Sequence, residues 1–110
     1  MDVFSALADP TRRKIIEMLA DEGQLPAAEI AAHFPFSAPA ISQHLKVLQK
    51  AGLVSVEKRA QQRIYRINPQ AMLELEDWVR QLNQLWNRRF DTLETLLEEE
   101  IRKEKTDGQE

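Results

Sequence analysis

The stretch from Ser37 to Gly52, SAPAISQHLKVLQKAG, decides the fold of this chain. Ser37 is a good N-cap, because its hydroxyl can accept a hydrogen bond from a backbone N–H of the first helical turn. Pro39 falls in that first turn, where a missing N–H costs nothing. Gly52 suits the left-handed position that follows a helix end. Helical spacing predicts one buried stripe on this segment, formed by Ile41, Leu45 and Leu48.

The opposite face of this predicted helix is small, polar and cationic. It carries Lys46 and Lys50 but no Asp or Glu, whereas a surface helix normally mixes both signs of charge. Gln43 can pair bidentately with adenine, and Ser42 can reach a base edge or a phosphate. By itself the pattern also fits a solvated amphipathic helix, so the flanking segments must decide. The candidate DNA-contacting residues here are Ser37, Ala38, Ala40, Ser42, Gln43, His44, Lys46 and Lys50.

Length and composition indicate one ordinary globular domain. The chain has 110 residues, 43% of them hydrophobic and 30% charged, which is enough for one small core and favours a dimer. It has no cysteine, which excludes disulfides and thiolate metal sites within the chain. No apolar run approaches membrane-spanning length, and the N-terminus lacks the layout of a signal peptide. We therefore expect a cytoplasmic protein with no membrane partner.

The net charge of −3 conceals a strong asymmetry. Between residues 37 and 66 there are six Lys and Arg residues against the single acid Glu57. From Pro69 onward there are eleven acidic and six basic residues. Contact is made by one face, and salt screens distant charges over about 10 Å. The local distribution therefore favours a nucleic-acid partner.

Three short helices are predicted before the central stretch. The first ends near Ala8, the second starts at Asp9-Pro10 and stops near Gly23, and the third covers residues 27–34. Arg12 and Arg13 are candidate phosphate contacts, because their charge opposes the helix dipole unless an anion compensates. The third helix, a turn of about three residues and the central helix together predict a helix-turn-helix. The residues expected to face inward on the second and third helices are Ile15, Ile16, Leu19, Ile30, Ala31 and Phe34.

A basic β-hairpin is predicted next. Residues 53–57 contain two β-branched valines and alternate partially, and residues 63–67 alternate with period two. The polar connection between them is basic, as in the wing of a winged helix. Lys58, Arg59 and Arg63 are expected to contact mainly phosphates, which position a protein without reading sequence.

The chain then predicts one long helix, which Asn68-Pro69 caps and opens. Its apolar residues recur in steps of three and four, as in a coiled-coil-like seam several heptads long. At 1.5 Å per residue, a helix of some thirty residues is about 45 Å long, more than a small core can cover. Part of the stripe therefore needs a partner chain. The predicted arrangement is one domain, residues 1–102, with the recognition helix at 38–51, the wing at 53–67, the last helix at 69–102 and a fraying polar tail at 103–110.

Two segments, ALADPTRRKIIEMLA and ISQHLKVLQKAGLVSVEKRAQQRIYRIN, resemble the ArsR (ArsR/SmtB) family of bacterial winged-helix regulators. The closing helix, with Trp78 and the run WNRRF at residues 86–90, is similar to the metal-independent, SdpR-like branch. The resemblance implies a mainly α winged helix-turn-helix with a two-stranded wing. It also implies a homodimer built on the first and last helices, with two recognition helices in successive major grooves. The expected dimer residues are Val3, Phe4, Leu7, Leu75, Val79, Leu82, Trp86, Phe90 and Leu93.

The chain departs from the family pattern in two ways. Metal-sensing members carry cysteines in the third helix or Asp and His pairs on the last, whereas here the only histidines, His33 and His44, lie apart. No metal site and no cofactor are therefore expected. The wing tip has Ala60-Gln61-Gln62 where the family often has glycine, which leaves the form of the turn open.

These patterns predict a homodimeric, sequence-specific DNA-binding repressor and not an enzyme, since no nucleophile–base pair or phosphate loop is present. One alternative is a winged-helix protein–protein module whose cationic face meets an acidic partner. Another is a regulator that responds to a small molecule bound between the first and last helices near Trp78 and Trp86. A small-molecule or protein effector, the operator and the regulated genes are left open.

Overall fold

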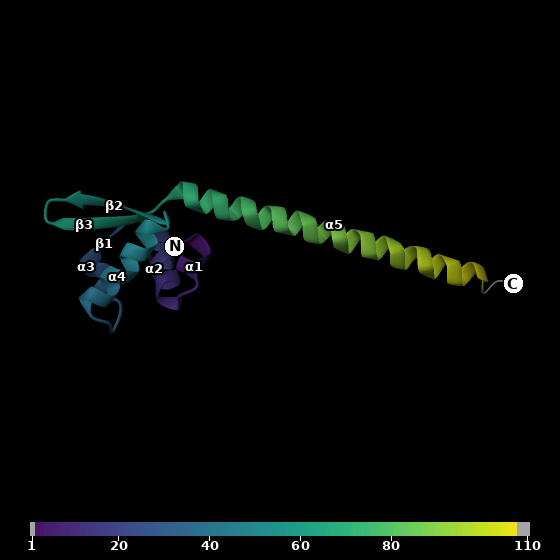
Figure 1. Cartoon of the computed structure of the whole chain (residues 1–110), viewed down its shortest axis with the longest axis horizontal. Helices are drawn as coiled ribbons and strands as arrows, with labels where there is room; N and C mark the ends of the chain where they lie inside the picture. The colour runs from purple at the N-terminus through teal and green to yellow at the C-terminus, as the bar shows by residue number, and fades with distance from the viewer. Residues whose placement is uncertain (1, 108–110) are drawn as a thin grey trace. The chain divides into compact units, whose positions relative to one another are not determined.

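The computed structural model describes residues 2–107. It divides between Leu73 and Glu74 into two units, a winged-helix unit and a helical unit, and each is described by itself. Figure 1 labels the elements in chain order. The helices of the first unit are α1 (Val3–Leu7), α2 (Pro10–Glu22), α3 (Ala27–Ala32) and α4 (Ala38–Lys50).

Side-chain caps start three of these helices. Asp2 Oδ1 accepts from Ser5 N–H at 2.7 Å, Asp9 Oδ1 accepts from Thr11 N–H at 2.8 Å, and Ser37 Oγ accepts from Ala40 N–H at 3.3 Å. The predicted starts of α2 and α4 are therefore confirmed by the groups that satisfy their free N–H donors. Gly23 ends α2 with φ +86°, a conformation that side chains disfavour.

The core of the first unit lies where α2, α3 and α4 meet the sheet. Its seven fully buried large side chains are Ile15, Leu19, Ile30, Ile41, Leu45, Leu48 and Leu53. This confirms the stripe on α4 and three of the six residues expected to face inward on α2 and α3, namely Ile15, Leu19 and Ile30. Ile16, Ala31 and Phe34 are only half-buried. α3 and α4 pack against each other and both contact the hairpin (Figure 1).

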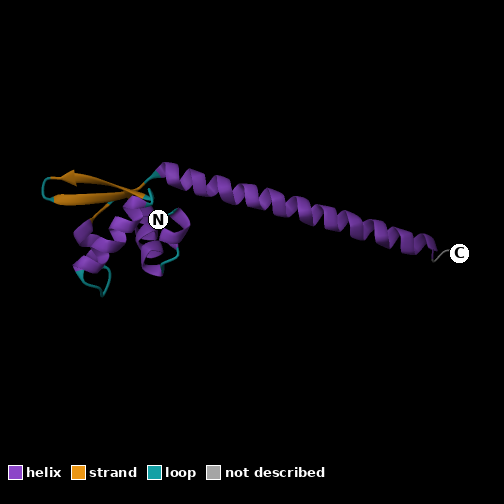
Figure 2. Ribbon diagram, viewed as in Figure 1, coloured by secondary structure: helices purple, strands orange, loops and turns teal. Residues whose placement is uncertain are grey.

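The sheet has three antiparallel strands in the order β1-β3-β2, with β1 at Leu25–Pro26, β2 at Val54–Arg59 and β3 at Gln62–Ile67. The hairpin of β2 and β3 is as predicted and stands out in Figure 2. Strand β1 is an addition to the predicted two-stranded wing, and it pairs Leu25 with Tyr65 and Pro26 with Ile64. A strand of two residues is too short to show alternation in the sequence. Its proline has no N–H to donate, and it is tolerated because β1 lies at the edge of the sheet.

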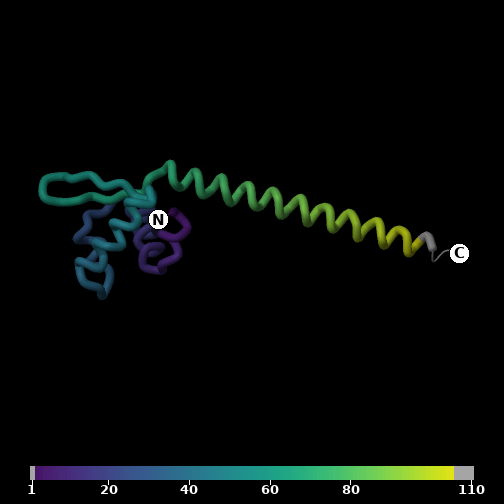
Figure 3. The backbone as a smooth tube through the Cα atoms, in the orientation of Figure 1, coloured from purple at the N-terminus to yellow at the C-terminus, as the bar shows by residue number. Residues whose placement is uncertain are grey.

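The wing turn forms without glycine. Arg59 and Gln62 are the last paired residues, so the loop consists of Ala60 and Gln61 (Figure 3). Ala60 has φ +55° and is the only non-glycine residue with positive φ among those described. A positive φ at the first loop residue is typical of a type II′ turn, which prefers glycine there. Ala60 therefore holds a conformation that costs about 1–2 kcal/mol for a residue with a Cβ.

Helix α5 runs without interruption from Pro69 to Asp107 (Figure 2). Asn68 caps it, since its Oδ1 accepts from Gln70 N–H at 3.1 Å, and its Nδ2 donates to Gly52 O at 2.9 Å. The helix passes the predicted end at residue 102, because the Lys and Glu residues there are good helix formers and lysine suits a helix C-terminus. The predicted helix end at residue 102 is therefore too early, since residues 103–107 are helical, while residues 108–110 lie outside the described part. Fraying of the polar tail stays a prediction.

Candidate nucleic-acid interface

Helix α4 presents an exposed face free of negative charge. Ser37 fixes the start of this helix, and Ile41, Leu45 and Leu48 hold its other side in the core. No Asp or Glu occurs in α4, so nothing on the helix itself would repel a phosphate. The exposed residues of the helix are Ala38, Pro39, Ala40, Ser42, Gln43, Lys46, Gln49 and Lys50.

The turn before α4 carries an aromatic stack that periodicity does not predict. The rings of Phe34 and Phe36 lie parallel within 11°, with centroids 6.1 Å apart. His33 meets Phe34 edge-on at 5.5 Å. Aromatic pairs of this kind add to burial alone. The stack thus gives the short link between α3 and α4 a packing contact of its own.

The two faces of the wing differ in charge. Lys58 and Arg63 are directly opposite each other in the β2–β3 register. Like charges at such positions destabilise a sheet, so this pair has no structural benefit of its own. Arg63 also lines a hollow of about 230 Å³ beside Ala38 and Ser42 of α4. This residue therefore links the wing to the exposed start of α4.

Arg59 lies one residue further and so points to the other face of the hairpin. Its Nη2 donates to Glu57 Oε2 at 3.2 Å, and both side chains are about half exposed. An exposed pair of this kind is weak, so Arg59 stays accessible to another anion. Its expected phosphate contact remains a prediction, as does that of Lys58.

Arg12 and Arg13 reach back to the end of α1. Arg12 Nε donates to Ala6 O at 2.6 Å, and its Nη2 donates to Ser5 O at 3.3 Å. Arg13 Nη1 donates to Leu7 O at 2.8 Å and Ala8 O at 3.2 Å. The structure thus gives both guanidinium groups partners within the protein. Their phosphate contacts remain predictions.

His44 is a residue of α4, and its side chain reaches the start of α2. Its Nδ1 is 3.3 Å from Arg12 Nη1, and the ring is only half-buried. The Asp9 carboxylate caps α2 in the same region. The backbone N–H of Arg12 lowers the pKa of Asp9 below its ordinary value of 3.8, although partial burial opposes the shift. Nothing in helical periodicity could predict contacts between residues 32 positions apart.

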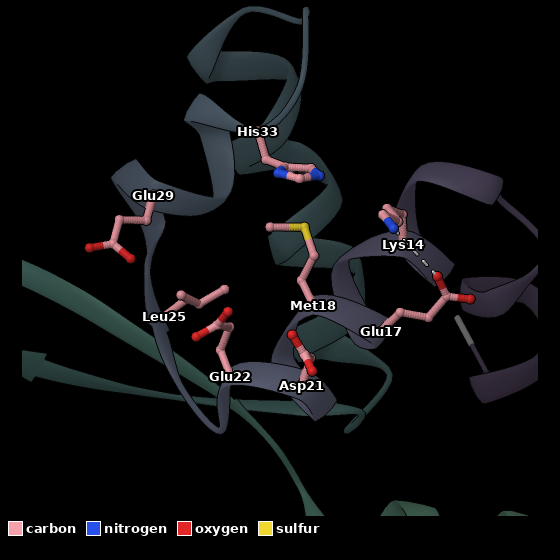
Figure 4. Close-up of a pocket in the computed structure, with 8 residues that line it drawn as sticks. All are labelled: Lys14, Glu17, Met18, Asp21, Glu22, Leu25, Glu29 and His33. Atoms are coloured by element: carbon pink, nitrogen blue, oxygen red, sulfur yellow. Dashed lines mark ion pairs between the residues drawn. The ribbon is translucent and has the colours of Figure 1, made fainter.

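A groove of about 460 Å³ between α2 and α3 gathers acidic side chains (Figure 4). Glu17, Asp21 and Glu22 come from α2 and Glu29 from α3, with Met18 and Leu25 also lining it. The acids of α2 and α3 thus share one groove, which α4 does not line. His33 also lines this groove, whereas His44 contacts Arg12. Within residues 2–107, no three His, Asp or Glu side chains are grouped so as to hold a metal ion.

The expected dimer residues lie partly in each unit. In α1, Val3 and Leu7 are half-buried and Phe4 is 51% exposed. In α5, Leu75 is half-buried and every described side chain from residue 76 to residue 105 is exposed. The exposed fraction runs from 44% at Leu82 to 65% at Trp86. The remaining members, Val79, Phe90 and Leu93, are 47%, 58% and 55% exposed.

A short helix, a tight turn, a capped helix with an acid-free face and a basic hairpin define a winged helix-turn-helix of the DNA-binding class. Residues 9–56 match the family model described as bacterial regulatory protein, arsR family. The chain is 38% identical to the transcriptional repressor SdpR of Bacillus subtilis, over 71% of this chain and 86% of SdpR. It is 39% identical to the HTH-type transcriptional regulator Rv2034 of Mycobacterium tuberculosis, over 88% of this chain and 87% of that protein.

A solved structure supports the same assignment. It is the homodimeric winged helix-turn-helix DNA-binding domain of Mb0332 from Mycobacterium bovis, 27% identical with a TM-score of 0.61, over 74% of this chain and 75% of that one. This chain belongs to the arsR family of bacterial regulatory proteins. It is a DNA-binding transcriptional regulator and not an enzyme. No helix within residues 2–107 is long and apolar enough to cross a membrane.

Proposed function

We propose that the chain is a homodimeric repressor that binds a specific duplex operator through α4 and the wing. The observation that carries this proposal is the exposed face of α4, which has small and polar residues, two lysines and no acid. An α-helix fits the major groove, and such a face can approach base edges without repulsion. The acids of α2 and α3 line a separate groove, to which α4 does not contribute.

The base-reading residues in this proposal lie on the first half of α4. Gln43 pairs with adenine, Ser42 contacts a base edge or a phosphate, and Ala38 and Ala40 let the helix sit close or touch a thymine methyl. All four side chains are exposed. The residues proposed to position the complex through phosphate are Ser37, Lys46, Lys50, Lys58, Arg59 and Arg63.

The proposed dimer uses α1 and α5. An apolar stripe with side chains 44–65% exposed is costly in water, and a second copy of the stripe would cover it. Mb0332 is described as homodimeric, which supports the same assembly here. The domain in this proposal comprises residues 1–102, because Ile101 is the last large apolar residue of the stripe.

Repression is proposed by analogy with SdpR, whose name states that role. Regulation without a metal is supported by the available ligands. The chain has no cysteine, and its two histidines are apart, since His33 lines the groove of α2 and α3 whereas His44 contacts Arg12. A cytoplasmic location follows from a DNA partner. An effector, if the protein uses one, must act on a surface other than a family metal site.

The test is fluorescence anisotropy of the purified protein with a duplex from its own upstream promoter and with a scrambled duplex, across a salt series. We expect tight binding to the promoter, weaker binding to the scrambled duplex, and a steep decrease of affinity with salt. Equal affinity for both duplexes would contradict an operator-specific repressor. Weak, salt-insensitive binding to both would favour the protein–protein module.

A further inference from the structure

Arg12 connects three helices through one guanidinium group. Its Nε and Nη2 donate to Ala6 O and Ser5 O of α1 at 2.6 and 3.3 Å. Its Nη1 lies 3.3 Å from Nδ1 of His44 on α4. Arg12 itself belongs to the first turn of α2. The side chain therefore ties the recognition helix to the N-terminal helix.

The chemistry of this contact fixes the state of the imidazole. A guanidinium has five N–H donors and no acceptor, and it stays protonated. Nδ1 of His44 must therefore accept, which requires a neutral ring with its proton on Nε2. A second proton on the ring would remove the acceptor and place two cations 3.3 Å apart.

We infer that Arg12 and His44 form a pH-sensitive latch, which holds α4 in its DNA-binding position while His44 is neutral and releases it when His44 is protonated. Histidine is the side chain that ordinarily changes charge between pH 5 and 8. Gln43, the proposed adenine reader, precedes His44 directly in α4. A small movement of α4 would therefore displace the base-reading face. Arg12 and His44 are positioning residues in this inference, which rests on the proposed role of α4.

Charged side chains from several elements surround the region of the His44 ring. From α2, the Arg12 guanidinium lies 3.3 Å from Nδ1 of His44, and the Asp9 carboxylate caps the same helical turn. α1, Val3–Leu7, carries no titratable side chain. The titratable residues of α3, Glu29 and His33, line the acidic groove, and those of β2, Glu57, Lys58 and Arg59, are exposed on the hairpin. Of these groups, Arg12 is the one whose contact with the ring nitrogen the structure shows.

Three variants separate this latch from a direct DNA contact. His44→Asn keeps an acceptor oxygen near the place of Nδ1 and removes the titration. Arg12→Lys keeps the charge but loses the planar fork that serves three acceptors at once. His33→Asn is the matched control, because it removes the other histidine, which lines the acidic groove. Circular dichroism and thermal melting verify that each variant is folded.

The DNA measurement is promoter affinity by anisotropy at pH 7.5 and pH 5.5, at constant ionic strength. We expect wild type and His33→Asn to bind at least threefold more weakly at pH 5.5, and His44→Asn to change less than twofold. Arg12→Lys should bind at pH 7.5 about as weakly as wild type at pH 5.5, with an unchanged salt slope. A pH response that His44→Asn retains would overturn the latch. Tighter binding of wild type at pH 5.5 that His44→Asn loses would also overturn it, because His44 would then contact phosphate as a cation.

A second measurement needs no DNA. NMR of the ¹⁵N-histidine-labelled protein at pH 7.5 should show Nδ1 of His44 without a proton and Nε2 with one, and the His33→Asn spectrum assigns the signals. A proton on Nδ1 would overturn the latch whatever the DNA result. If NMR shows the expected ring state but the protein binds no duplex, the proposed function is wrong. The proposed control of DNA binding by this contact is then wrong as well. The ring measurement thus distinguishes an error in the latch from an error in the proposed function.

Discussion

Arg12 and Arg13 follow Asp9 in the first turn of α2, where positive charge opposes the helix dipole. Their guanidinium groups instead reach the carbonyls that end α1, where the dipole is negative and cations are favoured. The side chains thus cap the preceding helix rather than their own. The sequence reveals the residue types but not this outcome, because the angle between α1 and α2 determines which carbonyls come within reach.

The Asp9 cap carries a prediction about stability and pH. Asp9→Ala should lower the free energy of unfolding by about 1 kcal/mol at pH 7, because two backbone N–H donors lose their acceptor. The pKa of Asp9 is lowered in the folded state, so its charged form stabilises the fold above the ordinary value of 3.8. That contribution is lost as the pH falls through the lowered pKa.

The measurement is urea denaturation of wild type and Asp9→Ala at pH 7 and pH 2.5, at one protein concentration. The difference between the two proteins should narrow at the acidic pH. Asp21→Ala, at an exposed position near the end of the same helix, should show no such loss at pH 7. An equal loss for Asp21→Ala would contradict the capping role of Asp9.

Gln43 carries the prediction about specificity. Gln43→Ala should cost about 1–3 kcal/mol on the preferred promoter duplex and much less on a scrambled duplex, because a bidentate contact to adenine is lost. Anisotropy titrations of both duplexes measure the two changes. Gln49→Ala is the control, since Gln49 is exposed near the other end of α4. Equal losses on both duplexes would remove Gln43 from base reading.

The predictability of the elements follows from the strength of their local signals. The caps, the apolar stripe of α4 and the alternation of the wing are signals carried within each element's own sequence. The elements that they predict are confirmed. Strand β1 depends on pairing with residues about 40 positions away, and α5 continues through a polar segment that has no stop signal. Arg63 was expected at phosphate, but only the strand register places it on the side of α4.

The wing turn yields a prediction at the level of the element. Ala60→Gly should raise the free energy of unfolding by up to about 1 kcal/mol, because glycine adopts the φ of +55° without strain. Ala20→Gly, at an exposed site within α2, should lower it by about 1 kcal/mol. Denaturant titration measures both. A loss of stability in Ala60→Gly would contradict strain at the wing tip.

The two faces of the wing yield another prediction. Arg63→Ala should weaken binding to every duplex alike and reduce the magnitude of the salt slope by about one unit, because one phosphate contact is removed. Arg59→Ala should reduce it less, since Arg59 lies on the other face beside Glu57. Anisotropy across a salt series gives both slopes. A larger effect of Arg59→Ala would place that face of the wing against the DNA.

At the scale of the whole chain, charge and apolar surface are segregated. The net charge of −3 would by itself argue against DNA, yet α4 has no acid and the acids of α2 and α3 share one groove. The absence of acids from α4 can be predicted from the sequence, because the residues of one helix are contiguous in the chain. The sequence does not predict the groove, since only the packing of α2 and α3 brings residue 29 near residues 17–22.

The apolar stripe of α5 has a regular period. Its residues recur at intervals of eleven rather than seven, in the sets Leu75, Trp86 and Leu97, Val79, Phe90 and Ile101, and Leu82 and Leu93. Such a period is about 3.67 residues per turn, close to the 3.6 of a straight helix. On a nearly straight helix this repeat keeps one face apolar from residue 75 to residue 101. The next position of the repeat is Glu104, which ends the stripe.

The proposed dimer can be tested on this stripe. Leu82→Glu places a charge in the middle of the seam and should shift the protein toward monomer, because burial of an unpaired carboxylate is costly. Gln84→Glu adds the same charge about 200° around the helix, away from the stripe, and should leave the dimer intact. Sedimentation velocity over a concentration series measures the distribution of species. The shortened chain 1–102 should behave as wild type, since it retains every apolar position of the repeat. A stable dimer in Leu82→Glu would move the interface away from this part of α5, and monomers from the 1–102 chain would extend the interface beyond the apolar stripe.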